Sequence, residues 1–414
     1  MSTSEIAPSV PLQAPPSRAS YSYALAYLKT AIVVLVVAHH AALAYHPSAP
    51  PPPLSLLTQP RVWQAYPIVD SHRAVWAAVF ATFNDVFFMA LMFFVSGLFV
   101  WKSLQRKGEG AYLRDRWLRL AVPFLPAAII LAPLAYYPSY LQMPGHGGFG
   151  DFLRQWISLG TWSAGPVWFC WVLLVFDLIV LQLLRTIPRC GERLGSLAGR
   201  LSDRPVKFFA ALVAITAAVY APLAFLAGPF HWTFVGPFGF QTSRILLYFV
   251  YFVAGIGVGA WGLERGLLAP QGRLSTQWPV WMLRTIVAFL AFAVALQAAV
   301  SRGPQPTIHT GIPSPAWIVA LLLFPVSCAA SCFAFLAVFL RFFQRRIAAW
   351  EGLSRDAYGI FLLHFVFVSW FGYALLPAAL PALIKFLVVT SGAVALSWSA
   401  TLLLRRIPGA GRVL

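Results

Sequence analysis

Two adjacent histidines, His39 and His40, stand near the end of an apolar stretch that follows Lys29. Ionisable side chains inside a membrane span are costly and are therefore candidates for function. On a helix, Lys29 and His40 would lie about 16 Å apart, and the two imidazoles would point about 100° apart. We therefore expect only one histidine to face a central cavity. A neutral imidazole can take a proton from a hydroxyl nucleophile, but a hydrogen bond between helices explains the pattern equally well.

The next apolar stretch contains Asn84 and Asp85 at a depth that broadly matches His40. Either side chain can orient an imidazole or hold the hydroxyl of an acceptor, and a buried structural hydrogen bond is an equal alternative. His364, near the C-terminus, is the other histidine far from any loop, and Asp177 is an intramembrane acid with no evident partner in the sequence.

A basic cluster opens the third apolar stretch and consists of Arg114, Arg116 and Arg119. Arginine suits phosphate binding because its planar guanidinium donates hydrogen bonds in pairs. Ordinary anchoring at the membrane surface is the simpler explanation, and composition alone favours it.

The composition indicates a membrane protein. Of the 414 residues, 60% are hydrophobic and only 10% are charged, whereas soluble domains carry roughly 25% charged residues. The net charge of +18 comes from basic residues in short connections between apolar runs. That distribution is typical of membrane topology control, and it excludes a nucleic-acid-binding function.

The apolar runs predict an all-α, polytopic membrane protein with about ten transmembrane helices. The predicted spans are 24–45, 75–101, 118–137, 164–185, 208–227, 244–263, 281–300, 316–340, 356–377 and 382–403.

Alternate connections, taken with both terminal segments, hold 24 of the 30 lysines and arginines. Because positive residues stay on the cytoplasmic side, this bias predicts that both termini are cytoplasmic. We expect a disordered tail over 1–21, one membrane domain over 22–404 and a short basic tail over 405–414.

Five motifs in this order resemble the acyltransferase 3 family of integral membrane acyltransferases, over nearly all of residues 22–403. They are K-x10-H, FFVSGLFV, RDRWLRLAVPFL, GPVWFCWVLLVFDL and AYGIFLLHFVFV. The resemblance implies an enzyme of a bacterial inner membrane that takes an acyl group from a cytoplasmic thioester, usually acetyl-CoA. Known members acylate surface polysaccharides and periplasmic glucans, so the implied acceptor is a carbohydrate or a lipid-linked glycan.

The resemblance also implies roles for single residues. His40 matches the essential histidine, and Lys29 stands where the family usually has a donor-binding arginine. The Arg114, Arg116 and Arg119 cluster falls where the family has basic residues associated with acyl-CoA. The remaining matches to family motifs are Ser96, Gly97, Trp168, Tyr358, Gly359 and His364.

The sequence therefore predicts an O-acyltransferase in which the acyl-CoA phosphates rest on Lys29 and the arginine cluster. His40 acts as the general base or as a transient acyl carrier. The expected partners are the lipid bilayer, the acyl-CoA donor and the glycan acceptor, with a homodimer allowed; no permanently bound cofactor or metal is expected.

Two other classes of protein remain open from the sequence. One is a proton-coupled transporter or flippase of a small solute or lipid-linked sugar, with the histidines as proton relays. The other is an inactive membrane scaffold, in which Lys29, His40 and Arg116 would not converge on one cavity.

Overall fold

The computed structural model describes residues 22–187, 189–311 and 313–413. The tail predicted over 1–21 lies outside them. Ten helical segments in the described part are long and apolar enough to cross a membrane, as predicted. They are Tyr23–Leu43, Val75–Lys107, Glu109–Leu141, Gly165–Thr186, Pro205–Ala227, Thr242–Trp261, Trp278–Arg302, Pro315–Phe342, Ala348–Ala374 and Ala382–Leu404.

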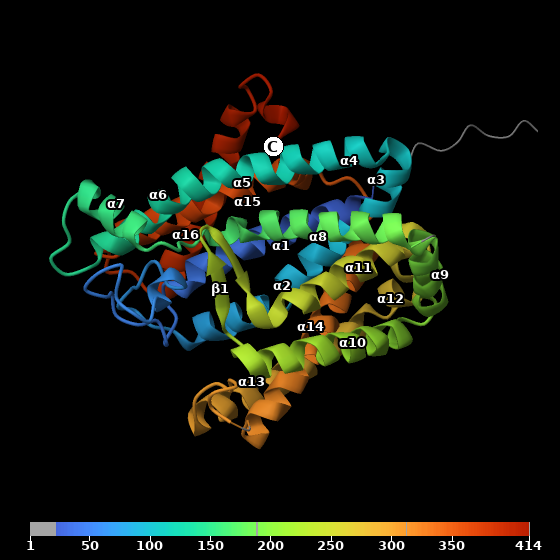
Figure 1. Cartoon of the computed structure of the whole chain (residues 1–414), viewed down its shortest axis with the longest axis horizontal. Coiled ribbons are helices and arrows are strands. Elements are labelled where there is room, and N and C mark those ends of the chain that lie inside the picture. Colours follow the sequence, from blue (N-terminus) through green and yellow to red (C-terminus); the bar gives the residue numbers. More distant parts are fainter. Residues whose placement is uncertain (1–21, 188, 312, 414) are drawn as a thin grey trace, which may run out of the picture.

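The helices that build these spans and their connections are labelled in Figure 1 where there is room. They are α1 (Tyr23–Leu43), α2 (Val75–Gly97), α3 (Val100–Lys107), α4 (Glu109–Arg116), α5 (Val122–Pro126), α6 (Ala132–Leu141), α7 (Phe149–Ser158), α8 (Trp168–Thr186), α9 (Cys190–Ser202), α10 (Pro205–Ala227), α11 (Ile245–Trp261), α12 (Arg273–Thr276), α13 (Trp278–Arg302), α14 (Pro315–Phe342), α15 (Ala348–Ala374) and α16 (Ala382–Leu404).

The largest boundary differences concern two spans. The third span starts at Glu109 and the ninth at Ala348, about two turns earlier than the apolar runs suggested. Both early segments carry charged residues, and a helix continues past the apolar region wherever its backbone hydrogen bonds can still form. Apolar composition therefore marks the membrane-crossing part of a helix and not its ends.

The bundle has two different ends. The basic end carries most of the lysines and arginines and includes α3, α4, α9 and α12. The loop end carries residues 44–74, helix α7 and a small hairpin (Figure 1). In the hairpin, β1 (Trp232–Val235) pairs antiparallel with β2 (Phe238–Gln241). This stretch of the sequence is rich in glycine, proline and aromatic residues.

Helix α1 is at the centre of the bundle and packs against α2, α14, α15 and α16. Its sequence is apolar on almost every side, which is the pattern of a helix enclosed by others rather than one with a single buried face. The histidine pair is therefore held inside the bundle.

Close backbone contact joins α2 to α11. A methyl group added at Gly97 would lie 2.2 Å from the carbonyl oxygen of Phe252, and one added at Gly255 would lie 2.1 Å from that of Phe94. The small pair Ser96–Gly97 therefore lies where α2 and α11 are in backbone contact. Small residues allow helices to approach in this way in membranes.

Candidate active site

His40 meets His364 across the interface between α1 and α15. The centroids of the two imidazole rings lie 5.5 Å apart, and the ring of Phe365 lies 5.1 Å from that of His40. These helices are separated by more than three hundred residues in the chain, so sequence spacing does not indicate the contact. The structure thus brings together two of the predicted site residues.

His364 is fully buried, and a hydrogen bond to the backbone determines which nitrogen of its ring carries the proton. Its Nδ1 lies 2.7 Å from the carbonyl oxygen of Phe361. Because a carbonyl oxygen only accepts, Nδ1 carries the proton and donates it. In the neutral ring, Nε2 is then an acceptor, and it has no partner among the described residues. The structure leaves a free acceptor nitrogen in the ring next to His40.

The two neighbouring histidines face different helices. The ring of His39 packs 5.1 Å from Phe88 of α2, and His39 does not line the pocket described next. The expectation that only one of the pair faces a cavity is confirmed, and that residue is His40. The roughly 100° step between successive residues of a helix is the physical reason.

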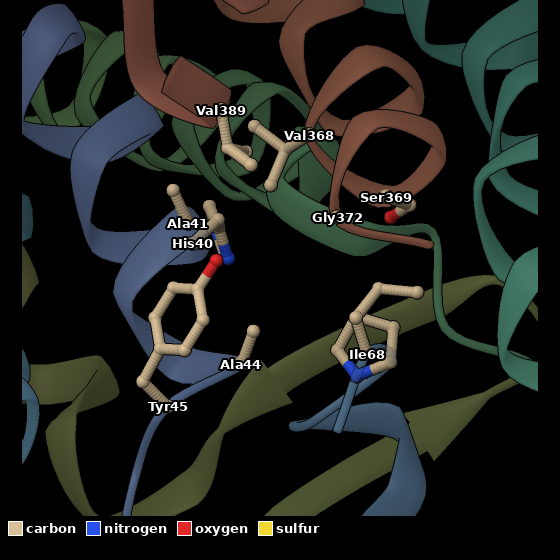
Figure 2. A pocket seen from close by; sticks show the side chains of 10 residues that line it. His40, Ala41, Ala44, Tyr45, Ile68, Val368, Ser369, Gly372 and Val389 are labelled. Carbon is tan, nitrogen blue, oxygen red and sulfur yellow. The ribbon is translucent and has the colours of Figure 1, made fainter. Parts of the chain in front are cut away.

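A pocket opens beside His40 toward the loop end (Figure 2). Its empty space is about 280 Å³, the open mouth included. Helices α1, α15 and α16 and the loop after α1 provide the walls. The lining residues are His40, Ala41, Ala44, Tyr45, Pro67, Ile68, Val368, Ser369, Gly372 and Val389.

The loop that contributes Pro67 and Ile68 is fastened by a buried ion pair. Nζ of Lys385 on α16 lies 2.7 Å from Oδ2 of Asp70, and both side chains are buried. Burial alone would raise the pKa of Asp70. The hydrogen bonds that it accepts from Lys385 and His72 outweigh burial and hold this pKa below its ordinary value. The ion pair therefore fixes one wall of the pocket.

Toward the basic end, Lys29 and Arg119 come together. Both side chains are exposed, and their positive charges lie close enough to repel each other. Neither forms an ion pair within the described part of the chain. Eleven positions separate Lys29 from His40, which is three helical turns to within about 20°. The two side chains thus leave α1 on the same face.

Tyr358 connects this region to α15. Its hydroxyl donates to the backbone carbonyl of Arg119. That carbonyl would normally accept from the residue four positions on, but Pro123 stands there and has no N–H. The chain forms a wider π-helical turn at Trp117–Ala121, a feature often found near functional sites. Tyr358 therefore stabilises the irregular turn that carries Arg119.

The other two arginines of the cluster differ in whether they form an ion pair. Arg114 is exposed and forms no ion pair among the described residues. Arg116 pairs with Asp177 of α8, with Nε 3.3 Å from Oδ2, and Tyr112 donates to the same carboxylate at 2.5 Å. The intramembrane acid without a partner in the sequence thus has one in the structure. Neither Lys29 nor Arg116 lines the pocket beside His40.

Asp85 pairs with an arginine rather than with an imidazole. The Nη2 atom of Arg244 lies 2.7 Å from Oδ2 of Asp85, and Nη1 donates to the backbone carbonyl of Asp85 at 2.9 Å. No hydrogen bond joins Asp85 to either histidine of α1 within the described residues. Asn84 is fully buried, and neither polar atom of its side chain has a partner there. Asp85 lies close enough to His39 to interact electrostatically with it. Neither Asn84 nor Asp85 lines the pocket.

The remaining predicted residues have structural contacts. Ser96 donates its hydroxyl to the carbonyl of Met92 at 2.8 Å. The ring of Trp168 packs 5.5 Å from Trp232 and thereby supports the hairpin on α8. Neither Ser96 nor Trp168 lines the pocket beside His40.

Sequence reasoning missed Tyr45 and Ser369, which line the pocket with His40. Tyr45 comes five residues after His40, and Ser369 comes five residues after His364. This equal spacing is the one signal in the sequence that links them. A tyrosine near a membrane surface and a serine in a helix are both common, so composition gave no reason to select them.

The fold defines a multi-pass membrane protein with polar side chains buried inside its helical bundle. The family model described as an acyltransferase domain matches residues 22–402. The chain therefore belongs to the acyltransferase 3 family, and this membership indicates an acyltransferase. No curated protein and no solved structure matches the chain.

Proposed function

We propose that the protein transfers an acyl group from a cytoplasmic acyl-CoA to a hydroxyl of a carbohydrate or lipid-linked glycan. The observation that carries the proposal is the placement of His40. It lines a pocket toward the loop end, and it shares one face of α1 with Lys29 near the basic end. A single helix thus links a cationic region to an imidazole about 16 Å away.

The basic end supports the donor side of this proposal. Lys29, Arg114 and Arg119 are exposed cations without ion-pair partners in the described residues, and phosphates of CoA are the matching anions. In this proposal the basic end faces the cytoplasm, as the distribution of positive charge predicts. The extended arm of CoA would carry the thioester along α1 toward His40.

The histidine pair supports the chemical step. Nε2 of His364 can accept the N–H of His40, which leaves the other nitrogen of His40 free to act as a base. As the acceptor hydroxyl attacks the thioester carbonyl, His40 takes its proton and the new C–O bond forms. The C–S bond then breaks, and the protonated His40 returns the proton to the CoA sulfur. General-base catalysis of this kind contributes about 10²–10⁴-fold.

Purified protein in lipid nanodiscs tests the proposal. With acetyl-CoA and a panel of envelope glycans, we expect release of the CoA thiol and acetylation of one class of glycan, detected by mass spectrometry. His40→Gln should lower kcat by at least about 10²-fold. His146→Gln replaces an exposed histidine of the loop end and should retain the activity. Full activity of His40→Gln, or no thiol release by the natural sequence with any hydroxyl acceptor, would refute the proposal.

A further inference from the structure

The pocket beside His40 is apolar apart from three side chains, which belong to His40, Tyr45 and Ser369. His40 is on α1, Tyr45 lies just after the end of α1, and Ser369 is on α15. In Figure 2 the phenol of Tyr45 reaches back from the end of α1 toward His40, while Ser369 lies on the α15 wall. Two hydroxyl-bearing residues thus line the same pocket as His40.

Tyr45 has a free hydroxyl in a buried position. Its side chain is 1% exposed. No side-chain hydrogen bond of Tyr45 is found within the described residues, and its oxygen is not among the fully enclosed partnerless atoms. Burial and the nearby negative charge of Asp70 both raise the pKa of this phenol. The phenol stays protonated at neutral pH, and so it is available as a donor rather than as an anion.

Ser369 also has a free hydroxyl, as do Ser202, Ser327, Ser331 and Ser397, but among these five only Ser369 lines the pocket beside His40. Serines in helices commonly donate to the carbonyl four residues earlier. Ser96 and Ser391 do so in this chain, at 2.8 and 2.7 Å. The fully buried Oγ of Ser369 has no partner among the described residues. A buried hydroxyl without a partner costs free energy, which a bound substrate would recover.

We propose that Tyr45 and Ser369 donate hydrogen bonds to the negatively charged oxygen that forms on the thioester carbonyl during acyl transfer. The inference rests on the proposed function, because it assumes that His40 is the base. When the acceptor oxygen attacks, the carbonyl π electrons move onto this oxygen, and the acceptor proton moves to His40. The oxygen re-forms the carbonyl when the C–S bond breaks. Preorganised donors are most effective in a site that excludes water.

The first test replaces Tyr45→Phe in the full chain, assayed with acetyl-CoA and the acceptor identified above. Loss of one such donor should lower kcat by about 10²–10³-fold. The KM for acetyl-CoA should change less than about threefold, because the interaction forms only in the transition state. A purely structural role would instead lower thermal stability and leave kcat per folded molecule unchanged.

Tyr27→Phe, on α1, is the matched control for Tyr45, which lies just after the end of that helix. Tyr27 is equally buried, but it lies at the basic end, where its oxygen accepts from the backbone N–H of Ile347 at 2.9 Å. We expect its kcat to stay within about twofold of the natural sequence.

Ser369→Ala provides a second test that does not depend on the folding of the tyrosine variant. The second donor should be worth about tenfold in kcat. Ser397→Ala is its control, since Ser397 on α16 is also fully buried with a partnerless Oγ but does not line the pocket.

The outcomes separate this inference from the proposed function. If Tyr45→Phe and Ser369→Ala keep kcat at the level of their controls while His40→Gln is inactive, the inference is wrong and the proposed function stands. If the natural sequence never cleaves acetyl-CoA, both are wrong.

Discussion

Two ion pairs inside the bundle each join an arginine to an aspartate, but they differ in which of the two side chains is exposed. Near the loop end, the guanidinium of Arg244 is 3% exposed while the carboxylate of Asp85 is 42% exposed. Toward the basic end, the carboxylate of Asp177 is fully buried while the guanidinium of Arg116 is 20% exposed. The accessible member is thus an anion at one end and a cation at the other.

This difference shows how one type of interaction can give two ends opposite surface chemistry. A buried charge needs a partner in either case. The choice of which member is accessible is independent of that need and depends on how the helices pack. An accessible cation suits the phosphates of the proposed donor, and an accessible carboxylate suits hydroxyl groups of the proposed acceptor.

The largest effect is expected from Asp85→Ala, which leaves the buried guanidinium of Arg244 without its carboxylate. An arginine cannot lose its proton to escape this cost, and breaking a buried pair from one side costs about 3–5 kcal/mol. Arg244→Met should cost less, because Asp85 can be hydrated. Thermal unfolding of both variants in one detergent measures the order, and a more severe loss in Arg244→Met would contradict the comparison.

A smaller effect is expected from Arg116→Met. This change leaves Asp177 buried, but a carboxyl group can take up a proton and keep the hydrogen bond to Tyr112 as a neutral group. We expect a loss of about 2 kcal/mol, below that of Asp85→Ala. The same unfolding assay provides the measurement. A loss in Arg116→Met that exceeds the loss in Asp85→Ala would show that exposure does not decide which member is critical.

The smallest effect concerns a third pair, Asp70 and Lys385, in which neither member is accessible. Because the folded pKa of Asp70 is lowered, its contribution to stability is complete above about pH 4, the ordinary value for aspartate. It is lost as the pH falls through the lower folded value. Protease cleavage of the loop 46–74 should therefore stay constant at mildly acidic pH and rise only in stronger acid.

Lys385→Met is the control for this pH dependence. It should increase cleavage of the loop already at neutral pH. The reason is that the hydrogen bond between Lys385 and Asp70, which holds the loop and lowers the pKa of Asp70, is removed. Cleavage of the natural sequence that rises between about pH 7 and pH 5 would show that Asp70 does not control the loop.

The amino-acid sequence alone determined the features that depend on a single helix. Hydrophobic length specified the ten spans, and helical periodicity placed only one of His39 and His40 toward a cavity. The periodicity also fixes the distance from Lys29 to His40. These are local properties, since 3.6 residues per turn hold wherever a helix forms.

The tertiary structure alone decided which residues meet across helices. It brought His364 to His40, gave Asp177 its partner Arg116, and directed Asp85 to Arg244 instead of to an imidazole. It also placed Tyr45 and Ser369 in the pocket. Side-chain spacing within one helix does not encode the rotation of that helix against its neighbours. Packing sets this rotation, through close contacts such as the one between Gly97 and Phe252.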